Sequence, residues 1–412
     1  MSPNVTVRDI VGGVTAPKGF RAAGVSCGIK KRSPANPAPL DLALITTERA
    51  VSAAAVFTTN KAVAAPVVVS RDHLSHSGGL AAAVVVNAGC ANACTGDAGM
   101  EVARQMAAAA ASAAGCKSDQ VLVASTGVIG VPLSIDKVRA GVTAAAAALS
   151  ADGSDAAMRA IMTTDPFPKG KAVSVQTADG RSFAVGGIAK GSGMIEPRMA
   201  TMLGFLTTDA DVAPAVLQAA LSRVCDETFN AITVDGECST NDCVFALASG
   251  ASGVTIERED DPALLDALRD VAGHLAREIV RGGEGATKLV TVKITGAATA
   301  ADAWLAARAL ANSPLVKTAI HGGDPNWGRL IAAAGRSGAA FVLDRASVCI
   351  GAVPLFVNGT PHDERADDAA TVLAESTVTV SVDLGTDGSG TATMWTCDFS
   401  AEYVRINAEY RT

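Results

Sequence analysis

Residues 188–206 read Ile-Ala-Lys-Gly-Ser-Gly-Met-Ile-Glu-Pro-Arg-Met-Ala-Thr-Met-Leu-Gly-Phe-Leu. Gly191 and Gly193 follow an apolar run, and glycines there permit positive φ angles and the close approach of another backbone. Beyond Pro197 the segment passes through Ala200-Thr201 into a second apolar run. It therefore predicts a strand, a glycine-rich turn and a second strand that begins near a threonine.

Strands and helices alternate on both sides of this segment. Apolar runs bounded by Gly, Asn, Asp or Pro predict strands at 52–57, 83–87, 121–125, 171–176, 183–188, 203–207, 288–294 and 374–383. Helices are predicted at 97–115, 134–150, 211–229, 262–281 and 300–312. Asp179-Gly180 indicates a hairpin between two of the strands, so a purely parallel sheet is not expected. The interleaving indicates a layered α/β or α+β fold.

Composition excludes several classes of protein. The chain has 412 residues, 49% hydrophobic and 18% charged, enough for a sizeable core in one large or two to three ordinary domains. A net charge of −7 without long runs of like charge argues against nucleic-acid binding. No transmembrane segment or secretory signal is visible, and the nine cysteines form no CxxC pair. We therefore expect a reduced, cytoplasmic protein that does not bind a membrane.

Thr201 alone does not indicate chemistry, because threonines commonly form buried strands. The stretch 188–206, however, resembles the self-cleavage segment of the ornithine acetyltransferase family, the ArgJ proteins. Further segments resemble the same family, in family order and over essentially the whole chain: 14–20 with 28–30, 125–130, 162–165, 239–242, 283–288, 321–329 and 406–412.

The resemblance implies that the chain cuts its own backbone between Ala200 and Thr201, giving an α chain, 1–200, and a β chain, 201–412. The Thr201 hydroxyl would attack the Ala200 carbonyl and pass through an ester. Cleavage would leave Thr201 with a free α-amine, whose ordinary pKa of about 8 suits it to accept the proton of the neighbouring hydroxyl. Thr201 is thus the expected nucleophile, with its own amine as the base.

The resemblance also assigns roles to residues outside the cleavage segment. Thr126 and Gly127 match the family's oxyanion hole, which a strand at 121–125 would deliver. The matched substrate-binding residues are Thr164, Lys190, Thr201, Glu284, Asn407 and Thr412. A lysine suits an α-carboxylate, and a glutamate suits the ornithine amine. From pattern alone, a solvated loop lysine is the more ordinary interpretation of Lys190. The corresponding alternatives are a solvent-facing loop acid for Glu284, a cap or turn residue for Thr164, and a frayed terminus for Thr412.

His321 and Asp324 invite a His/Asp catalytic interpretation, but no local motif supports one. A lone histidine beside glycines is more often structural, and in the family the base is the new N-terminus. We therefore interpret this segment as structural, with Trp327 and Arg329 in packing or an ion pair.

The fold implied by the resemblance is α+β: an αββα layered core of the DmpA/ArgJ, self-processing Ntn-like type at 1–285, with a smaller mixed α/β domain at 286–412. The implied reaction is ping-pong transfer of acetyl from N2-acetyl-L-ornithine to L-glutamate in arginine biosynthesis. No metal or organic cofactor is expected, and the assembly would be a heterotetramer of two α and two β chains. Acetyl-CoA as a further acetyl donor is left open.

Two other functions fit the same residues. A self-processing aminopeptidase or amidohydrolase of the DmpA type would pass the acyl group to water. A non-catalytic binding protein could retain the fold without cleaving itself. Glutamate-dependent release of ornithine separates the first alternative from acetyl transfer, and an uncleaved chain would favour the second.

Overall fold

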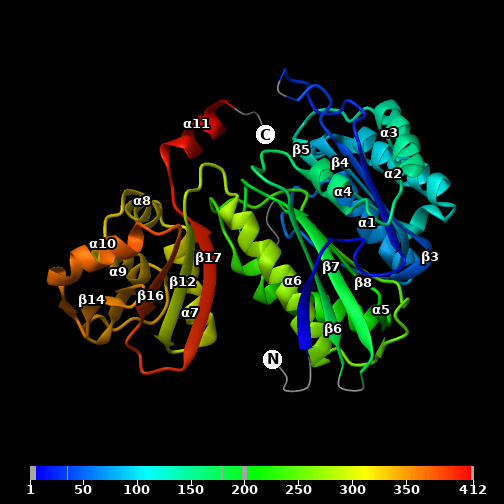
Figure 1. Ribbon diagram of the computed structural model, residues 1–412. Helices are drawn as coiled ribbons and strands as arrows, with labels where there is room; N and C mark the ends of the chain where they lie inside the picture. The colour runs from blue at the N-terminus through cyan, green and yellow to red at the C-terminus, as the bar shows by residue number, and fades with distance from the viewer. Residues whose placement is uncertain (1–5, 35, 178–179, 197–201, 410–412) are drawn as a thin grey trace.

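The computed structural model describes residues 6–34, 36–177, 180–196 and 202–409 (Figure 1). Its larger sheet has nine strands in the order β1-β6-β7-β8-β10-β3-β4-β5, with β2 paired to β3. The strands are β1 (Thr6–Ile10), β2 (Phe20–Val25), β3 (Leu42–Phe57), β4 (Leu80–Cys90), β5 (Val121–Val128), β6 (Lys169–Gln176), β7 (Ser182–Lys190), β8 (Leu203–Thr208) and β10 (Cys243–Ala248). A separate small sheet pairs β9 (Asp211–Val212) with β11 (Thr255–Ile256).

The long strand β3 connects the two halves of this sheet. Its last six residues pair with β10, whereas its first half pairs with β2 and β4. Lys190 on β7 donates a hydrogen bond to Thr126 on β5, although four strands lie between β7 and β5 in the sheet order. Neighbouring strands lie about 4.8 Å apart. The sheet must therefore fold over, so that its two halves face each other.

Alternation of side chains along the strands creates the layers. On β3, Ala43 and Ile45 point into the core between the two halves, and Leu42 and Leu44 point outward. The outer face of the β3–β5 half is covered by α1 (Ala65–His76), α2 (Gly96–Ala114) and α3 (Ile135–Ala147). The outer face of the other half is covered by α5 (Pro214–Glu227) and α6 (Pro262–Arg281). The predicted αββα core is confirmed.

The short helix α4 (Ser154–Ile161) packs into the central core. The 3-10 turns are η1 (Ser118–Gln120), η2 (Phe229–Ala231), η3 (Leu343–Arg345) and η4 (Asp363–Arg365).

A second sheet with its own hydrophobic core follows in the chain. It has six strands in the order β15-β14-β13-β16-β12-β17. They are β12 (Leu289–Ala297), β13 (Ser347–Ile350), β14 (Val353–Val357), β15 (Thr360–Pro361), β16 (Thr377–Asp383) and β17 (Gly390–Cys397). The helices beside them are α7 (Ala300–Ala311), α8 (Pro314–Gly322), α9 (Trp327–Gly335) and α10 (Ala366–Leu373). The division at 285/286 stays a prediction.

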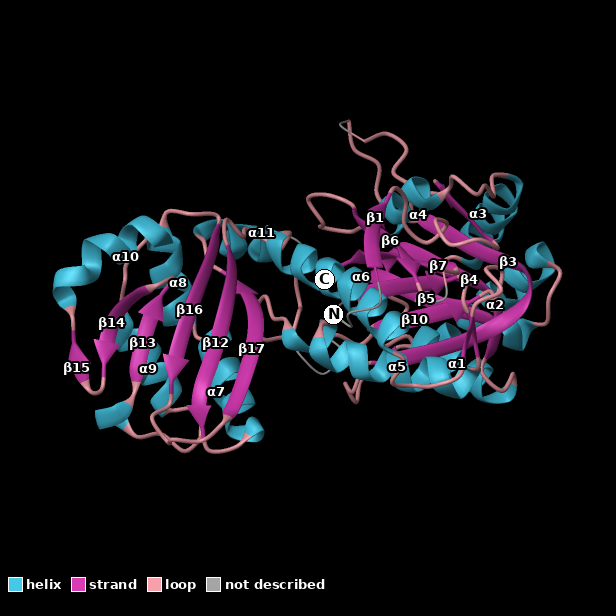
Figure 2. Ribbon diagram, turned by 60° about the horizontal axis from the view of Figure 1, so that its bottom comes forward, coloured by secondary structure: helices cyan, strands magenta, loops and turns pink. Residues whose placement is uncertain are grey.

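The last helix, α11 (Ala401–Glu409), returns from the second sheet toward the first (Figure 1, Figure 2). None of its described side chains is buried. In both views it leaves the second sheet near the end of β17 and points toward the first sheet. No helix in the described part of the chain is both long and apolar enough to cross a membrane.

Most predicted elements are present, with corrected bounds. The hairpin is confirmed, because β6 and β7 pair antiparallel with Val173 opposite Val185. The helix predicted from 211 begins only at Pro214, because Asp211–Val212 form a strand. Helix α1 was not predicted, since its Ala-Pro-Val-Val-Val start has the β-branched composition of a strand.

The core between the two sheet halves offers a test of the layered arrangement. Phe245 is fully buried there and packs edge-on against Phe57 and Phe205, with ring centroids 5.9 Å and 5.8 Å apart. We expect Phe245→Ala to destabilise the protein by about 3–5 kcal/mol, because it removes a buried ring and leaves a cavity. The midpoint of urea unfolding measures this loss. Leu305→Ala, at an exposed position, is the control, and equal midpoints for both variants would contradict the assignment.

Candidate active site

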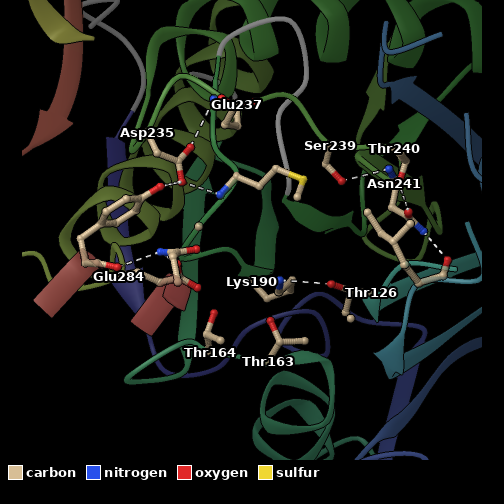
Figure 3. Close-up of a pocket in the computed structure, with 17 residues that line it drawn as sticks. Thr126, Thr163, Thr164, Lys190, Asp235, Glu237, Ser239, Thr240, Asn241 and Glu284 are labelled. Carbon is tan, nitrogen blue, oxygen red and sulfur yellow. Dashed lines mark hydrogen bonds between the residues drawn. The ribbon is translucent and has the colours of Figure 1, made fainter. Parts of the chain in front are cut away.

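One pocket, of about 120 Å³, lies where the ends of β5, β7 and α6 meet (Figure 3). It is lined by Ala91, Thr126, Gly127, Ile129, Thr163, Thr164, Lys190, Gly193, Met194, Asp235, Glu237, Ser239, Thr240, Asn241, Glu284, Tyr403 and Asn407. Six predicted site residues are therefore brought together: Thr126, Gly127, Thr164, Lys190, Glu284 and Asn407. The predictions for Ala200, Thr201 and Thr412 lie outside the described residues.

Thr126 and Gly127 lie within the last three residues of strand β5, which extends to Val128 and therefore beyond the predicted end at 125. Gly127 has a φ of +127°, and a Cβ atom there would lie 2.4 Å from the carbonyl carbon of Gly89 on β4. Only glycine permits both the angle and this approach. The Thr126 side chain points toward Lys190, whose Nζ donates to Thr126 Oγ1 over 3.2 Å (Figure 3).

Lys190 is buried at the end of β7, which rules out the solvated loop lysine that the pattern alone allowed. Burial lowers its pKa, and the nearby Asp165 carboxylate opposes that shift. Burial also acts to raise the pKa of Asp165, but the charges of Lys190 and Lys169 outweigh it and bring the pKa to about 2. Asp165 is therefore ionised at neutral pH, and its negative charge interacts with both lysines.

Asp165 connects two of the segments that line the pocket. Its Oδ1 accepts hydrogen bonds from Lys169 Nζ at 2.6 Å and from the Gly191 backbone N–H at 2.7 Å. Its Oδ2 accepts from the Thr163 backbone N–H at 3.0 Å. The Asp165–Lys169 pair is fully buried. One carboxylate thus fixes the turn that carries Thr163 and the end of β7 that carries Lys190.

Glu284 follows helix α6 and is also buried, so the solvent-facing alternative is wrong. Its backbone N–H donates to the Ser192 carbonyl at 2.9 Å, and Ser192 Oγ donates to the Gly282 carbonyl, which fastens the glycine-rich turn to the end of α6. A Cβ atom on Gly193 would lie 2.4 Å from Glu284 Oε2, so this glycine makes room for the carboxylate. Asn407 of α11 donates from Nδ2 to Glu284 Oε2 over 2.9 Å.

Two aspartates without a predicted role hold the described residues on either side of the predicted cleavage site. Asp235 accepts the backbone N–H groups of Met194 and Ile195 at 2.7 Å and 2.8 Å. Asp242 accepts the backbone N–H of Met202 at 2.9 Å. Burial raises the pKa of both carboxyls. Asp242 belongs to the family-like segment 239–242, so the sequence offers a signal for its role. Asp235 follows an apolar run, and no motif in the sequence marks it.

Asn241 is a third residue whose role was missed. Its Nδ2 donates to the carbonyls of Ala91 at 2.6 Å and Ser125 at 2.9 Å. It therefore ties the start of β10 to the strand end that carries Thr126. Asn241 belongs to the family-like segment 239–242, so this motif is a signal from which its importance could be predicted.

His321 lies outside the pocket, and its Nδ1 is 2.7 Å from Asp398 Oδ2, which also accepts from Thr287 Oγ1. This position is consistent with the prediction that residues 321–329 have a structural role. Trp327 stacks on Phe356, and Arg329 donates to the Leu315 carbonyl.

Asp165→Asn tests the role of the buried carboxylate. We expect it to cost about 3–5 kcal/mol at pH 7, because Lys169 and Lys190 lose their counter-charge. The folded pKa of about 2 lies below the ordinary 3.8, so this stabilisation is fully present only well above the unfolded pKa and is lost as the pH falls through the folded pKa. The difference in urea midpoint between wild type and variant should therefore shrink from pH 5 to pH 2.

The double variant Asp165→Asn with Lys169→Met is the control for this prediction. It removes one of the uncompensated charges and should recover part of the lost stability. A double variant less stable than the single one would show that the carboxylate does not act as the counter-charge.

The ArgJ family model matches residues 21–412. The chain is 50% identical over 408 residues to the arginine biosynthesis bifunctional protein ArgJ of Symbiobacterium thermophilum, covering 98% of this chain and 99% of that protein. It is 47% identical over 397 residues to the protein of the same name from Chlorobaculum tepidum, covering 96% of each. A solved structure of Mycobacterium tuberculosis ornithine acetyltransferase complexed with ornithine is 41% identical, covers 47% of this chain and 98% of that chain, and gives a TM-score of 0.41. The chain belongs to the ArgJ family.

Proposed function

We propose that this protein is a self-cleaving acyltransferase that moves an acetyl group from N2-acetyl-L-ornithine to L-glutamate through an acetyl-threonine intermediate. The observation that carries this proposal is the convergence of Thr126, Gly127, Lys190, Glu284 and Asn407 on one pocket. Those residues come from strands and helices far apart in the sequence. Membership of the ArgJ family, whose curated relatives are named for arginine biosynthesis, supports the same reaction.

The first proposed step is cleavage of the Ala200–Thr201 bond. The Thr201 hydroxyl attacks the Ala200 carbonyl, the C–N bond breaks, and the acyl group moves from nitrogen to oxygen. Water then hydrolyses this ester and leaves a carboxylate on Ala200 and a free amine on Thr201. Support comes from the anchoring of residues 194–195 by Asp235 and of Met202 by Asp242, which holds the chain on both sides of the proposed bond.

In the second step the freed amine takes the hydroxyl proton while the oxygen attacks the acetyl carbonyl of the donor. Thr126 is suited to stabilise the negative charge that develops there. An ammonium group only donates hydrogen bonds, so Thr126 Oγ1 must accept from Lys190. The Thr126 hydroxyl hydrogen is then free to point toward the oxyanion, and the nearby cation makes that hydrogen a stronger donor.

The charges of the pocket suit amino-acid substrates. Lys190 offers a cation for an α-carboxylate, and Glu284 offers a carboxylate for the ornithine amine. Ornithine leaves with the proton held by the Thr201 amine. Glutamate then enters, its amine attacks the acetyl ester, and N-acetylglutamate leaves. The proposed assembly is two α and two β chains, with no metal or organic cofactor in the reaction.

An exchange assay tests this function. We expect purified protein to release ornithine from N2-acetyl-L-ornithine only when glutamate is present, with one N-acetylglutamate formed for each ornithine. Initial rates at several glutamate concentrations should give parallel double-reciprocal lines, because a covalent intermediate separates the two substrates. Release of ornithine and acetate at the same rate without glutamate would instead show a hydrolase.

Thr126→Val tests the oxyanion role. It keeps the shape of the side chain but removes the hydroxyl, and we expect kcat of the fully cleaved enzyme to fall about 100-fold or more. Thr126→Ser retains the hydroxyl and should keep kcat within about tenfold of the wild-type value. Equal kcat values for the Val and Ser variants would show that the Thr126 hydroxyl does not stabilise the oxyanion.

A further inference from the structure

Glu196, on the segment that contains the proposed cut, is in contact with a helix of the second sheet. It lies four positions before the cut, and residues 197–201 are outside the described part of the chain. The Glu196 side chain is only 13% exposed. Its partners are Arg308 and Asn312 at the end of α7, the second of them 116 positions away in the sequence. The second sheet therefore reaches the cleavage segment through this helix.

Two polar contacts join Glu196 to the end of α7. Asn312 Nδ2 donates a hydrogen bond to Glu196 Oε2 over 2.7 Å. Arg308 Nε lies 3.5 Å from Glu196 Oε1, and the Arg308 side chain is the more exposed of the two. Burial raises the pKa of Glu196, whereas the Asn312 hydrogen bond and the Arg308 charge act against that shift. Both partners thus stabilise the charged form of the carboxylate.

Asn312 is itself held in place by the second sheet. Its backbone N–H donates to the Arg308 carbonyl at 3.1 Å and closes the end of α7. One side of α7 is buried in the second hydrophobic core, where Ala307 and Leu310 are fully covered. The Asn312 side chain is fixed as well, because its Oδ1 accepts from Thr233 Oγ1 at 2.7 Å. The helix end is therefore an ordered support for the carboxylate that it binds.

The backbone just before Glu196 is held separately, from the catalytic pocket. Gly193 and Met194 line that pocket, and Asp235 accepts the backbone N–H groups of Met194 and Ile195. The segment is thus fixed through its backbone at one residue and through a side chain at the next. An intramolecular attack requires the reacting atoms to lie about 3–3.5 Å apart in the right orientation. A chain that cuts itself depends on such contacts for that orientation.

We propose that Asn312 and Arg308 are positioning residues for self-cleavage. By holding Glu196, they favour the conformation in which the Thr201 hydroxyl reaches the carbonyl before it. This inference rests on the proposed function and leaves the bonds and proton transfers of that cleavage unchanged. Without the two contacts, the residues before the cut sample more conformations, and fewer of these permit the attack.

The same contact joins two chains once the bond is cut. Glu196 then belongs to the α chain, and Asn312 and Arg308 belong to the β chain. The hydrogen bond holds the α chain four residues from its new end. None of the three is among the described residues that line the catalytic pocket. Their substitution should therefore slow cleavage and leave the turnover of cleaved enzyme unchanged.

Asn312→Asp tests this inference in full-length precursor made by cell-free translation. The change removes the amide donor and sets a second carboxylate against Glu196, so we expect the half-time of cleavage to lengthen about tenfold or more. The appearance of the two fragments on a denaturing gel measures this half-time. Once cleaved, the variant should transfer acetyl from N2-acetyl-L-ornithine to glutamate with a kcat within about twofold of the wild-type value.

Adding Glu196→Gln to Asn312→Asp should rescue cleavage. The new glutamine amide can donate to the new aspartate, so the hydrogen bond returns with donor and acceptor exchanged. We expect the half-time to return to within about threefold of the wild-type value, a recovery that general damage to the second sheet would not allow. Asn358→Asp, at an exposed position between β14 and β15, is the matched control and should be cleaved like the wild type.

Glu196→Ala keeps the test independent of the folding of the second sheet. It removes both contacts but leaves α7 and its packing unaltered. We expect this variant to be cleaved about as slowly as Asn312→Asp, and its kcat after cleavage to match that of the wild type.

Two results would overturn the inference. In the first, Glu196→Ala is cleaved at the wild-type rate. In the second, the double variant is cleaved as slowly as Asn312→Asp alone. Either result leaves the proposed function intact when the wild-type protein cleaves itself and exchanges acetyl between ornithine and glutamate. A wild-type protein that does neither would instead refute the proposed function.

Discussion

The folding of one sheet over itself, which brings the end of β7 against the end of β5, is the constraint on which the rest of the structure depends. The hydrogen bond between Lys190 and Thr126 spans that fold. A buried ammonium is costly unless it is paired, so the arrangement also requires Asp165 and its partner Lys169. Phe205 and Phe245 pack in the core between the two sheet halves that this bond joins.

Two glycines complete the site at positions where the Cβ atom of any other residue would collide with a neighbouring atom. Gly127 lets β5 approach Gly89, and Gly193 leaves the space that the Glu284 carboxylate fills. The turn at 191–193 is bonded to the end of α6, and Asn407 reaches Glu284 from the far end of the chain. Among the described residues that line the pocket, Tyr403 and Asn407 on α11 are the ones that follow the second sheet in the chain.

The sequence predicted this site in part, for identifiable physical reasons. Strands such as β6 and β7 have short apolar runs around a turn signal, so both their existence and their antiparallel pairing followed from local pattern. The burial of Lys190 and Glu284 did not follow, because burial depends on the folding-over of the sheet and not on neighbouring residues. Asp235 and the buried pair of Asp165 with Lys169 act through contacts that appear only in three dimensions.

The central claim is that the protein creates its own catalyst by cutting before Thr201. The most direct measurement is the mass of the purified chain and the N-terminal residue of its fragments. We predict that the wild-type protein gives fragments of 200 and 212 residues, the second beginning with Thr201. The Thr201→Ala variant should give a single intact chain. An intact wild-type chain, or fragments from Thr201→Ala with the same masses as the wild type apart from the substitution, would contradict it.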